Sequence, residues 1–142
     1  MSNQDLDLQS GISAFEAKNF TMAMRLLSPL AEAGDAEAQY RMGMMFQNGL
    51  GRVTNAEAAA KWMHAAAEQG HVYAQHGLGV MYLYGEGVEK NEQEAANWFR
   101  QAAEQGLAGS QMTLGMMYEN GQGVEKDEAE AKRWYKLAEA SS

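Results

Sequence analysis

The residue types that most often carry chemistry are few in this chain, and their spacing does not bring them together. The sequence has three histidines and no cysteine, which excludes thiolate nucleophiles, cysteine-ligated metals and disulfides. His71 and His76 lie five positions apart and so diverge on a helix, and the His-Glu-x-x-His pattern of zinc enzymes is absent. No serine stands at helical spacing from a lysine or histidine, as an activated nucleophile would require. We therefore expect no metal site and no catalytic residue.

Two other patterns suggest chemistry but are better explained by structure. Carboxylates gather around Glu92 and Asp127, where helices are expected to begin, and a helix N-terminus favours negative charge. Gly-x-Gly segments begin at Gly49, Gly85 and Gly121, but a dinucleotide-binding loop needs a third glycine and a preceding strand. We expect solvated helix caps and structural loops, without a phosphate site or a cofactor.

Charge and hydropathy exclude further classes of partner. The chain has 11 Lys and Arg against 19 Asp and Glu, a net charge of -8, whereas nucleic-acid binders gain affinity from clustered cations. No apolar run approaches the ~18 residues of a membrane span, and residues 1–10 lack the basic and then apolar pattern of a signal peptide. We expect no nucleic-acid or membrane partner and a cytoplasmic location, unless an export signal has been removed.

The chain is organised by an internal repeat. Residues 35–70, 71–106 and 107–142, the second, third and fourth repeats, align without a gap. The coincident columns are Gly43, Gly79 and Gly115; Trp62, Trp98 and Trp134; Ala66, Ala102 and Ala138; Phe46, Tyr82 and Tyr118; and Ala59, Ala95 and Ala131. Chance does not produce so many coincident columns.

Glycines divide each repeat into two predicted helices. In the third repeat we expect helices over 71–84 and from Asn91 to just before Gly106. Residues suited to N-caps precede the second helices: Asn55, Asn91 and Asp127. Glu94 and Glu130, three positions after two of these caps, are typical of a capping box. Glycines suited to positive φ just after the helices are Gly34, Gly70 and Gly106.

Each predicted helix has one apolar stripe. In the second repeat the stripes are Ala38, Met42, Met45 and Phe46, and then Ala59, Trp62 and Ala66. Neither helix can bury its stripe alone, so we expect antiparallel helix pairs that stack on their neighbours. Gly43 and its equivalents should let the partner helix approach closely, with the tryptophan column filling the wider gap beside them.

These columns resemble the Sel1-like repeat, a relative of the tetratricopeptide repeat. The matching segments are AQYRMGMMF at 38–46, GLG at 49–51, AAKW at 59–62 and AAAEQG at 65–70, with GVMY at 79–82 and GMMY at 115–118 in the later repeats. The resemblance covers about three quarters of the chain. It implies a right-handed superhelix that serves as a protein-interaction scaffold, often in bacterial signalling or host contact, and it implies no catalytic residues.

The first quarter departs from this pattern. Residues 1–34 lack the Gly-x-Gly loop and turn through Ala17-Lys18-Asn19, which predicts a tetratricopeptide-like N-terminal capping helix pair. Its register is open, because either Gly11 aligns with Gly43 or Phe15 aligns with Phe46. Pro29 falls inside its second helix and should kink that helix.

The last helix carries the polar outer face that a terminal solenoid helix needs. Lys132, Arg133 and Lys136 stand where the third repeat has Ala96, Asn97 and Arg100. We expect one solenoid domain over residues 1–142, mostly monomeric, with end-to-end dimerisation as the alternative.

One set of side chains remains after the core is filled. It lies on each first helix opposite the tryptophan-filled core, the face that lines the concave groove in tetratricopeptide-like superhelices, and it carries Tyr and Met, which suit the anchoring of a partner. The candidate partner-binding residues are Tyr40, Met44, Asn48, Tyr73, His76, Leu83, Tyr84, Met112 and Asn120. The alternative is that these side chains only pack between neighbouring first helices, as we expect for Val80 and Met116.

The sequence thus predicts an all-α solenoid of about four helix pairs, that is eight helices, that binds protein without catalysis. A peptide or helix would lie along the groove, with Asn48 and Asn120 offering hydrogen bonds to its backbone. The acidic surface favours a neutral or basic partner. One alternative is an inhibitor or immunity-type protein that neutralises a single toxin or enzyme, and a more remote one is a hydrolase.

Overall fold

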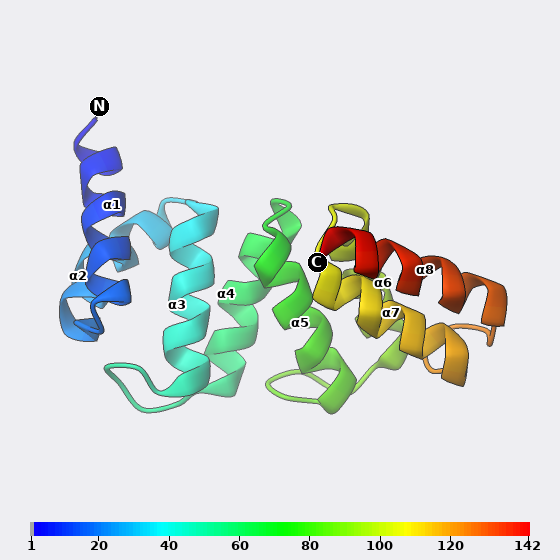
Figure 1. Ribbon diagram of the computed structural model, residues 1–142. Helices are drawn as coiled ribbons and strands as arrows, with labels where there is room; N and C mark the ends of the chain where they lie inside the picture. The colour runs from blue at the N-terminus through cyan, green and yellow to red at the C-terminus, as the bar shows by residue number, and fades with distance from the viewer. Residues whose placement is uncertain (1) are drawn as a thin grey trace. The chain divides into compact units, whose positions relative to one another are not determined.

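The regular structure of the chain is entirely helical over residues 2–142, which the computed structural model describes (Figure 1). These residues form eight α-helices and no strand: α1 (Asn3–Glu16), α2 (Phe20–Glu32), α3 (Ala36–Asn48), α4 (Ala56–Glu68), α5 (Val72–Tyr84), α6 (Glu92–Glu104), α7 (Ala108–Asn120) and α8 (Glu128–Ser141). The predicted all-α class and the number of helices are confirmed. Within the same residues no helix is long and apolar enough to cross a bilayer.

The helices form two compact units. The N-terminal unit, Met1–His71, contains α1–α4, and the C-terminal unit, Val72–Ser142, contains α5–α8. In each unit the helices pair in sequence order, and the second helix of the first pair packs against the first helix of the next pair, α2 on α3 and α6 on α7. The description of residues 1–34 as a cap, and of the whole chain as one domain, stays a prediction.

The helix boundaries follow the predicted caps. The side chains of Asn55, Asn91 and Asp127 accept hydrogen bonds from backbone N–H groups three residues later, at 3.0 to 3.1 Å. Gly34, Gly70 and Gly106 follow the C-caps with φ of 104°, 92° and 96°, conformations that glycine adopts without strain. Both sets of predictions are confirmed.

The predicted capping boxes are only half formed. In α6 and α8 the structure shows the bond to the cap side chain but not the reciprocal bond from Glu94 or Glu130. The Glu130 carboxylate instead accepts two hydrogen bonds from Arg133, at 2.9 and 3.0 Å. A complete box lies at the start of α1, between Ser2 and Asp5.

The glycine column does permit close helix packing, but the residue that faces it is not tryptophan. A Cβ at Gly43, Gly79 or Gly115 would lie 3.0, 2.9 or 2.7 Å from the side chain of Met63, Phe99 or Tyr135 respectively. Each of these residues directly follows the tryptophan of its repeat. Trp98 and Trp134 are buried, as predicted, whereas Trp62 is only half-buried. The tryptophan column is therefore less uniform than the sequence indicates.

The structure settles the register of the first helix pair. A Cβ at Gly11 would lie 2.5 Å from the side chain of Leu27, and Leu27 occupies the same repeat position as Met63. Gly11 is therefore the equivalent of Gly43. The shorter turn passes through Lys18, which has a φ of 64°, and Asn19 caps α2. Pro29 lies inside α2 as predicted.

A column of buried glutamines joins successive helix pairs. The side-chain Nε2 atoms of Gln39 and Gln111 donate to the carbonyls of Ala31 and Ala103, at the end of the preceding pair, at 3.1 and 3.0 Å. The amide oxygen of Gln39 accepts a hydrogen bond from Gln69 at 2.9 Å. The second and fourth repeats thus bond to the backbone of the repeat before them.

The fourth repeat lacks one member of this network. Gln105 donates to the amide oxygen of Gln75 at 2.7 Å, but the equivalent position of the fourth repeat is Ser141. The Oε1 atom of Gln111 is buried and has no hydrogen-bond partner. A buried acceptor without a donor destabilises the fold by about 1–3 kcal/mol.

Candidate partner-binding surface

The exposed apolar side chains gather on the first helices of the C-terminal unit. Eight large apolar side chains are exposed in residues 2–142, and four of these lie on α5 and α7: Tyr73 (55%), Tyr84 (68%), Met112 (44%) and Met116 (51%). We call these four side chains the Tyr–Met face. Isolated exposed apolar residues are ordinary, but a group of them on neighbouring helices is typical of an interaction surface.

The two helices adjoin on this side of the unit. The Nδ1 atom of His76, on α5, lies 2.7 Å from the hydroxyl oxygen of Ser110, on α7. His76 and Met112 occupy equivalent repeat positions, as do Tyr84 and Asn120. This contact between a half-buried and a buried side chain joins α5 to α7, and Figure 1 shows the course of both helices.

His76 and Leu83 belong more to the packing under this face than to the face itself. The half-buried His76 ring meets Phe99 edge-on, with 5.2 Å between ring centroids, and burial lowers the pKa of the imidazole. Leu83 and Val80 pack against the buried cluster that contains Phe99, in agreement with the expectation for Val80. The expectation that Met116 packs between helices is wrong, because half of its surface is exposed.

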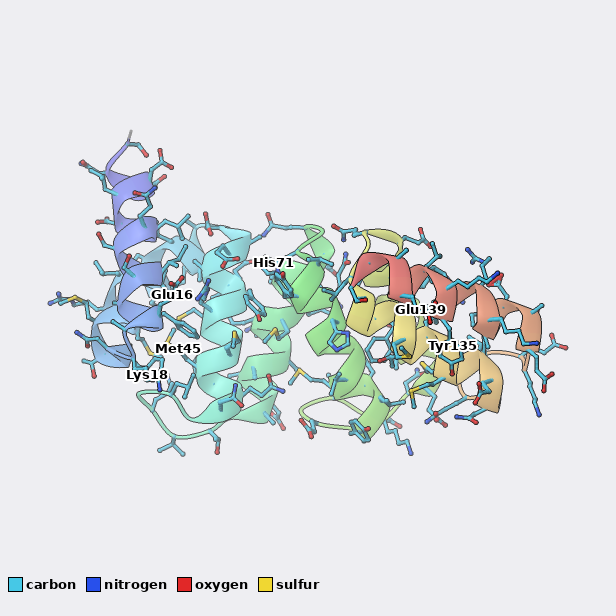
Figure 2. All side chains as sticks on the ribbon, viewed as in Figure 1. Glu16, Lys18, Met45, His71, Tyr135 and Glu139 are labelled. Atoms are coloured by element: carbon cyan, nitrogen blue, oxygen red, sulfur yellow. The ribbon has the colours of Figure 1, made fainter. Side chains whose placement is uncertain are left out.

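The acidic end of α7 limits the Tyr–Met face. Asn120 and Glu119 are exposed there. The phenol of Tyr135 on α8, which Figure 2 labels, donates a hydrogen bond to the Glu119 carboxylate. Partial desolvation and this neighbouring carboxylate raise the pKa of Tyr135. The face is thus apolar along most of α7 and negatively charged at its C-terminal end.

In the N-terminal unit the equivalent side chains contact their own chain. The half-buried Tyr40 ring stacks on His71, with centroids 4.5 Å apart and planes inclined by 27°. His71 Nε2 lies 2.5 Å from a Glu37 carboxylate oxygen, and the other Glu37 oxygen accepts a hydrogen bond from Arg41 at 2.9 Å. The bond to His71, and then Arg41, lower the pKa of Glu37.

The remaining predicted residues of this unit are less prominent. Met44 is half-buried, and Asn48 is exposed with its amide group donating to the Met44 carbonyl at 3.1 Å. The backbone hydrogen bonds that we predicted for Asn48 and Asn120 stay predictions. The Tyr–Met face of the C-terminal unit is therefore the stronger candidate surface.

Two recesses of the C-terminal unit lie on its loops. One of about 560 Å³ is lined by Arg100, Tyr118, Val124, Glu125, Lys126, Asp127 and Glu130, and one of about 500 Å³ is built from equivalent residues of the third repeat. The polar groups are largely engaged: Arg100 donates to the Tyr118 hydroxyl at 2.7 Å, and Asp127 caps α8. Arg133 holds the pKa of Glu130 below its usual value. These recesses present no nucleophile or metal-ligand set, and no group of three metal-binding side chains occurs among the described residues.

The Gly-x-Gly loops have a structural role that the sequence analysis did not identify. A Cβ at Gly51 would lie 2.7 Å from Phe20 Cβ, and one at Gly123 would collide with the Glu92 carbonyl oxygen. Phe20 and Glu92 begin the second helix of the preceding pair. The second glycine of these two loops therefore allows one repeat to contact the start of a helix in the repeat before it.

The Sel1 repeat family model matches residues 10–35, 36–71, 72–107 and 108–141. The chain belongs to the Sel1 repeat family. The resemblance noted in the three later repeats is confirmed, and the match extends to the shorter first pair. Sel1 repeat proteins are generally non-catalytic scaffolds that bind protein partners.

Solved structures agree with this family. A Sel1 repeat protein from Oxalobacter formigenes is 38% identical, with a TM-score of 0.91 over 95% of this chain and 56% of that chain. The c5321 protein, a protective antigen of uropathogenic Escherichia coli with an SLR fold, is 35% identical, with a TM-score of 0.93 over 99% of this chain and 31% of that one. This Sel1 repeat chain thus spans about half and about a third of these two relatives.

A more distant structure shows the fold alone. Helicobacter pylori cysteine rich protein B is 17% identical, with a TM-score of 0.64 over 99% of this chain and 89% of that chain. These neighbours are solenoid proteins from bacteria. No curated protein matches the Sel1 repeat chain.

Proposed function

We propose that this Sel1 repeat protein is a non-catalytic scaffold that binds a partner protein or peptide on the Tyr–Met face. The observation that carries the proposal is the exposure of Tyr73, Tyr84, Met112 and Met116 on two adjoining helices. Covering an apolar side chain of this size contributes about 1.5–3 kcal/mol, so exposing several on one side of a small unit favours a complex.

The residue types fit this role. Tyrosine combines a large rigid ring with a hydroxyl group and is common among the residues that dominate binding energy. Methionine is flexible and polarisable, and it adapts to varied partner side chains. A tyrosine at each end of α5 and two methionines on α7 therefore suit an apolar segment of a partner.

Charge favours a neutral or basic partner. The chain carries a net charge of -8, and Glu119 lies at the end of the Tyr–Met face. Opposite charge raises the rate of encounter more than it strengthens the final complex. Association should therefore slow as salt concentration rises, while the dissociation rate changes less.

The test is capture of partners from a lysate of the source organism with wild-type protein and with the Tyr73→Ala/Tyr84→Ala variant. A matched control is Leu6→Ala/Val53→Ala, which truncates two exposed apolar side chains of the N-terminal unit. We expect the control to retain a partner that the tyrosine variant loses, while circular dichroism shows the same helix content for all three proteins. Equal capture by both variants would place binding elsewhere.

A further inference from the structure

The sulfur chemistry of this chain is confined to methionine. The sequence has 11 methionines and no cysteine. Half of those that the structure describes are shielded: Met42, Met45, Met63, Met81 and Met117 are at most 3% exposed. Because susceptibility to oxidation follows exposure, these five sulfurs are protected by the core.

Three described methionines are exposed, and two of these lie on one helix, the third being Met22 on α2. Met112 and Met116 are one helical turn apart on α7, and both belong to the Tyr–Met face. Met117, the next residue, points into the core and is 2% exposed. The helix thus carries exposed and protected thioethers side by side.

We propose that Met112 and Met116 form a modification site that peroxides oxidise to methionine sulfoxide while the fold is kept. A sulfur lone pair attacks one oxygen of hydrogen peroxide, an S–O bond forms, and the O–O bond breaks. A proton transfers to the departing oxygen, so that the thioether is oxidised and the peroxide is reduced to water. Methionine sulfoxide reductases reverse this change.

The fold tolerates this chemistry at these two positions because the new oxygen can be hydrated. At Met81 or Met117 the same oxygen would be buried without a partner, which is costly. Oxidation at Met112 and Met116 therefore changes the surface and not the core. It converts the α7 half of the Tyr–Met face from apolar to polar.

The consequence for binding rests on the proposed function, whereas the oxidation does not. A partner that buries these thioethers would have to desolvate two sulfoxide oxygens, so oxidation should release it. The site would then couple partner binding to peroxide concentration in a chain without thiols.

The experiment is a hydrogen peroxide time course on the folded wild-type protein, with peptide mass spectrometry and hydrophobic-interaction chromatography. We expect Met112 and Met116 each to gain one oxygen roughly tenfold faster than Met117 and Met81. The oxidised protein should elute earlier from a phenyl matrix with unchanged circular dichroism, and reductase treatment should restore its retention.

Two variants provide matched controls. Met112→Leu/Met116→Leu keeps an apolar face without sulfur, so peroxide should no longer shift its retention by the wild-type amount. Met22→Leu removes an equally exposed methionine of the N-terminal unit and should leave most of the shift in place. Oxidation of Met112 and Met116 no faster than of Met117, or loss of helix content as they oxidise, would overturn the inference whether or not the face binds a partner.

Discussion

The two units place different side chains on the same side of their first helices. On α3 of the N-terminal unit, Tyr40 stacks on His71, and His71 and Arg41 both bind Glu37. On α5 and α7 of the C-terminal unit, two tyrosines and two methionines are exposed. One fold and one repeat pattern therefore produce an internally bonded face in one unit and an exposed apolar face in the other. The difference shows that repeat position alone does not make a binding residue.

Truncating tyrosines of one unit and then of the other should give the largest difference between the two faces. Tyr73→Ala/Tyr84→Ala should lower affinity for the captured partner by about 100-fold or more, since an anchoring tyrosine contributes about 2 kcal/mol. Tyr40→Ala should instead lower the free energy of unfolding by about 2 kcal/mol and leave binding little changed. Calorimetric titration and urea denaturation measure the two effects. Equal loss of affinity in both variants would contradict the comparison.

Destabilising one unit by a substitution in its loop should increase the opening of the helices of that unit alone. Gly123 has a φ of 71°, and a Cβ there would collide with the Glu92 carbonyl oxygen. Gly123→Ala should therefore destabilise the C-terminal unit by about 3 kcal/mol. Gly51→Ala should act similarly on the N-terminal unit, through Phe20. Hydrogen exchange resolves which helices open, and increased exchange should stay within the altered unit.

A glycine without these constraints is the control for this pair. Gly109 lies in α7, and a Cβ there would meet only the His76 ring at 3.8 Å. Gly109→Ala should therefore be neutral or stabilise α7 by about 0.5–1 kcal/mol, because alanine favours helix. Destabilisation comparable to that of Gly123→Ala would show that the loop contact is not the cause.

Acid should weaken the internally bonded face more than the exposed one. The pKa of Glu37 lies below its ordinary value of 4.5 in the folded protein, so this carboxylate adds stability above the unfolded pKa and loses it as pH falls through the folded pKa. The stability difference between wild type and Glu37→Gln should shrink as the pH falls below about 4.5. Thermal unfolding at a series of pH values measures it, with Glu86→Gln as an exposed control. A difference independent of pH would contradict the role of the carboxylate.

The smallest expected effect is the gain in stability from completing the glutamine network of the fourth repeat. Ser141→Gln restores the residue that the second and third repeats have after their second helix and gives the buried Gln111 oxygen a donor. We expect a gain of about 1 kcal/mol, measured by urea denaturation. Ser142→Gln, one residue further on, should give no gain.

The regular features of the fold are predictable because they depend on local sequence. The side chain of Asn91 caps a helix by accepting a hydrogen bond from the backbone N–H three residues later. Gly106 adopts a positive φ just after the helix that this cap begins. The columns that recur unchanged therefore reveal the period, the helices and their boundaries. The contacts of Gly43 were not predictable, because the facing residue differs in each repeat, Met63 being replaced by Phe99 and then Tyr135.

The candidate surface was only partly predictable for a related reason. Tyr40 and Tyr73 both face outward by helical spacing, but the stacking of Tyr40 depends on His71, the first residue of the next repeat. Val80 and Met116 hold equivalent repeat positions and were both expected to pack between helices, but Val80 is partly buried whereas Met116 is exposed. Burial of such side chains depends on neighbours that a single helix pattern does not specify.

The contacts of the buried glutamines and loop glycines have a consequence for how such a protein changes over time. Gln111 bonds to a backbone carbonyl, and Gly123 contacts the backbone at the start of α6. Neither contact depends on the side chain of the residue it meets. A duplicated repeat would therefore dock on its neighbour at once, and its outward-facing residues would be free to diverge by mutation without loss of assembly. New specificities can arise in this architecture by gene duplication followed by surface drift.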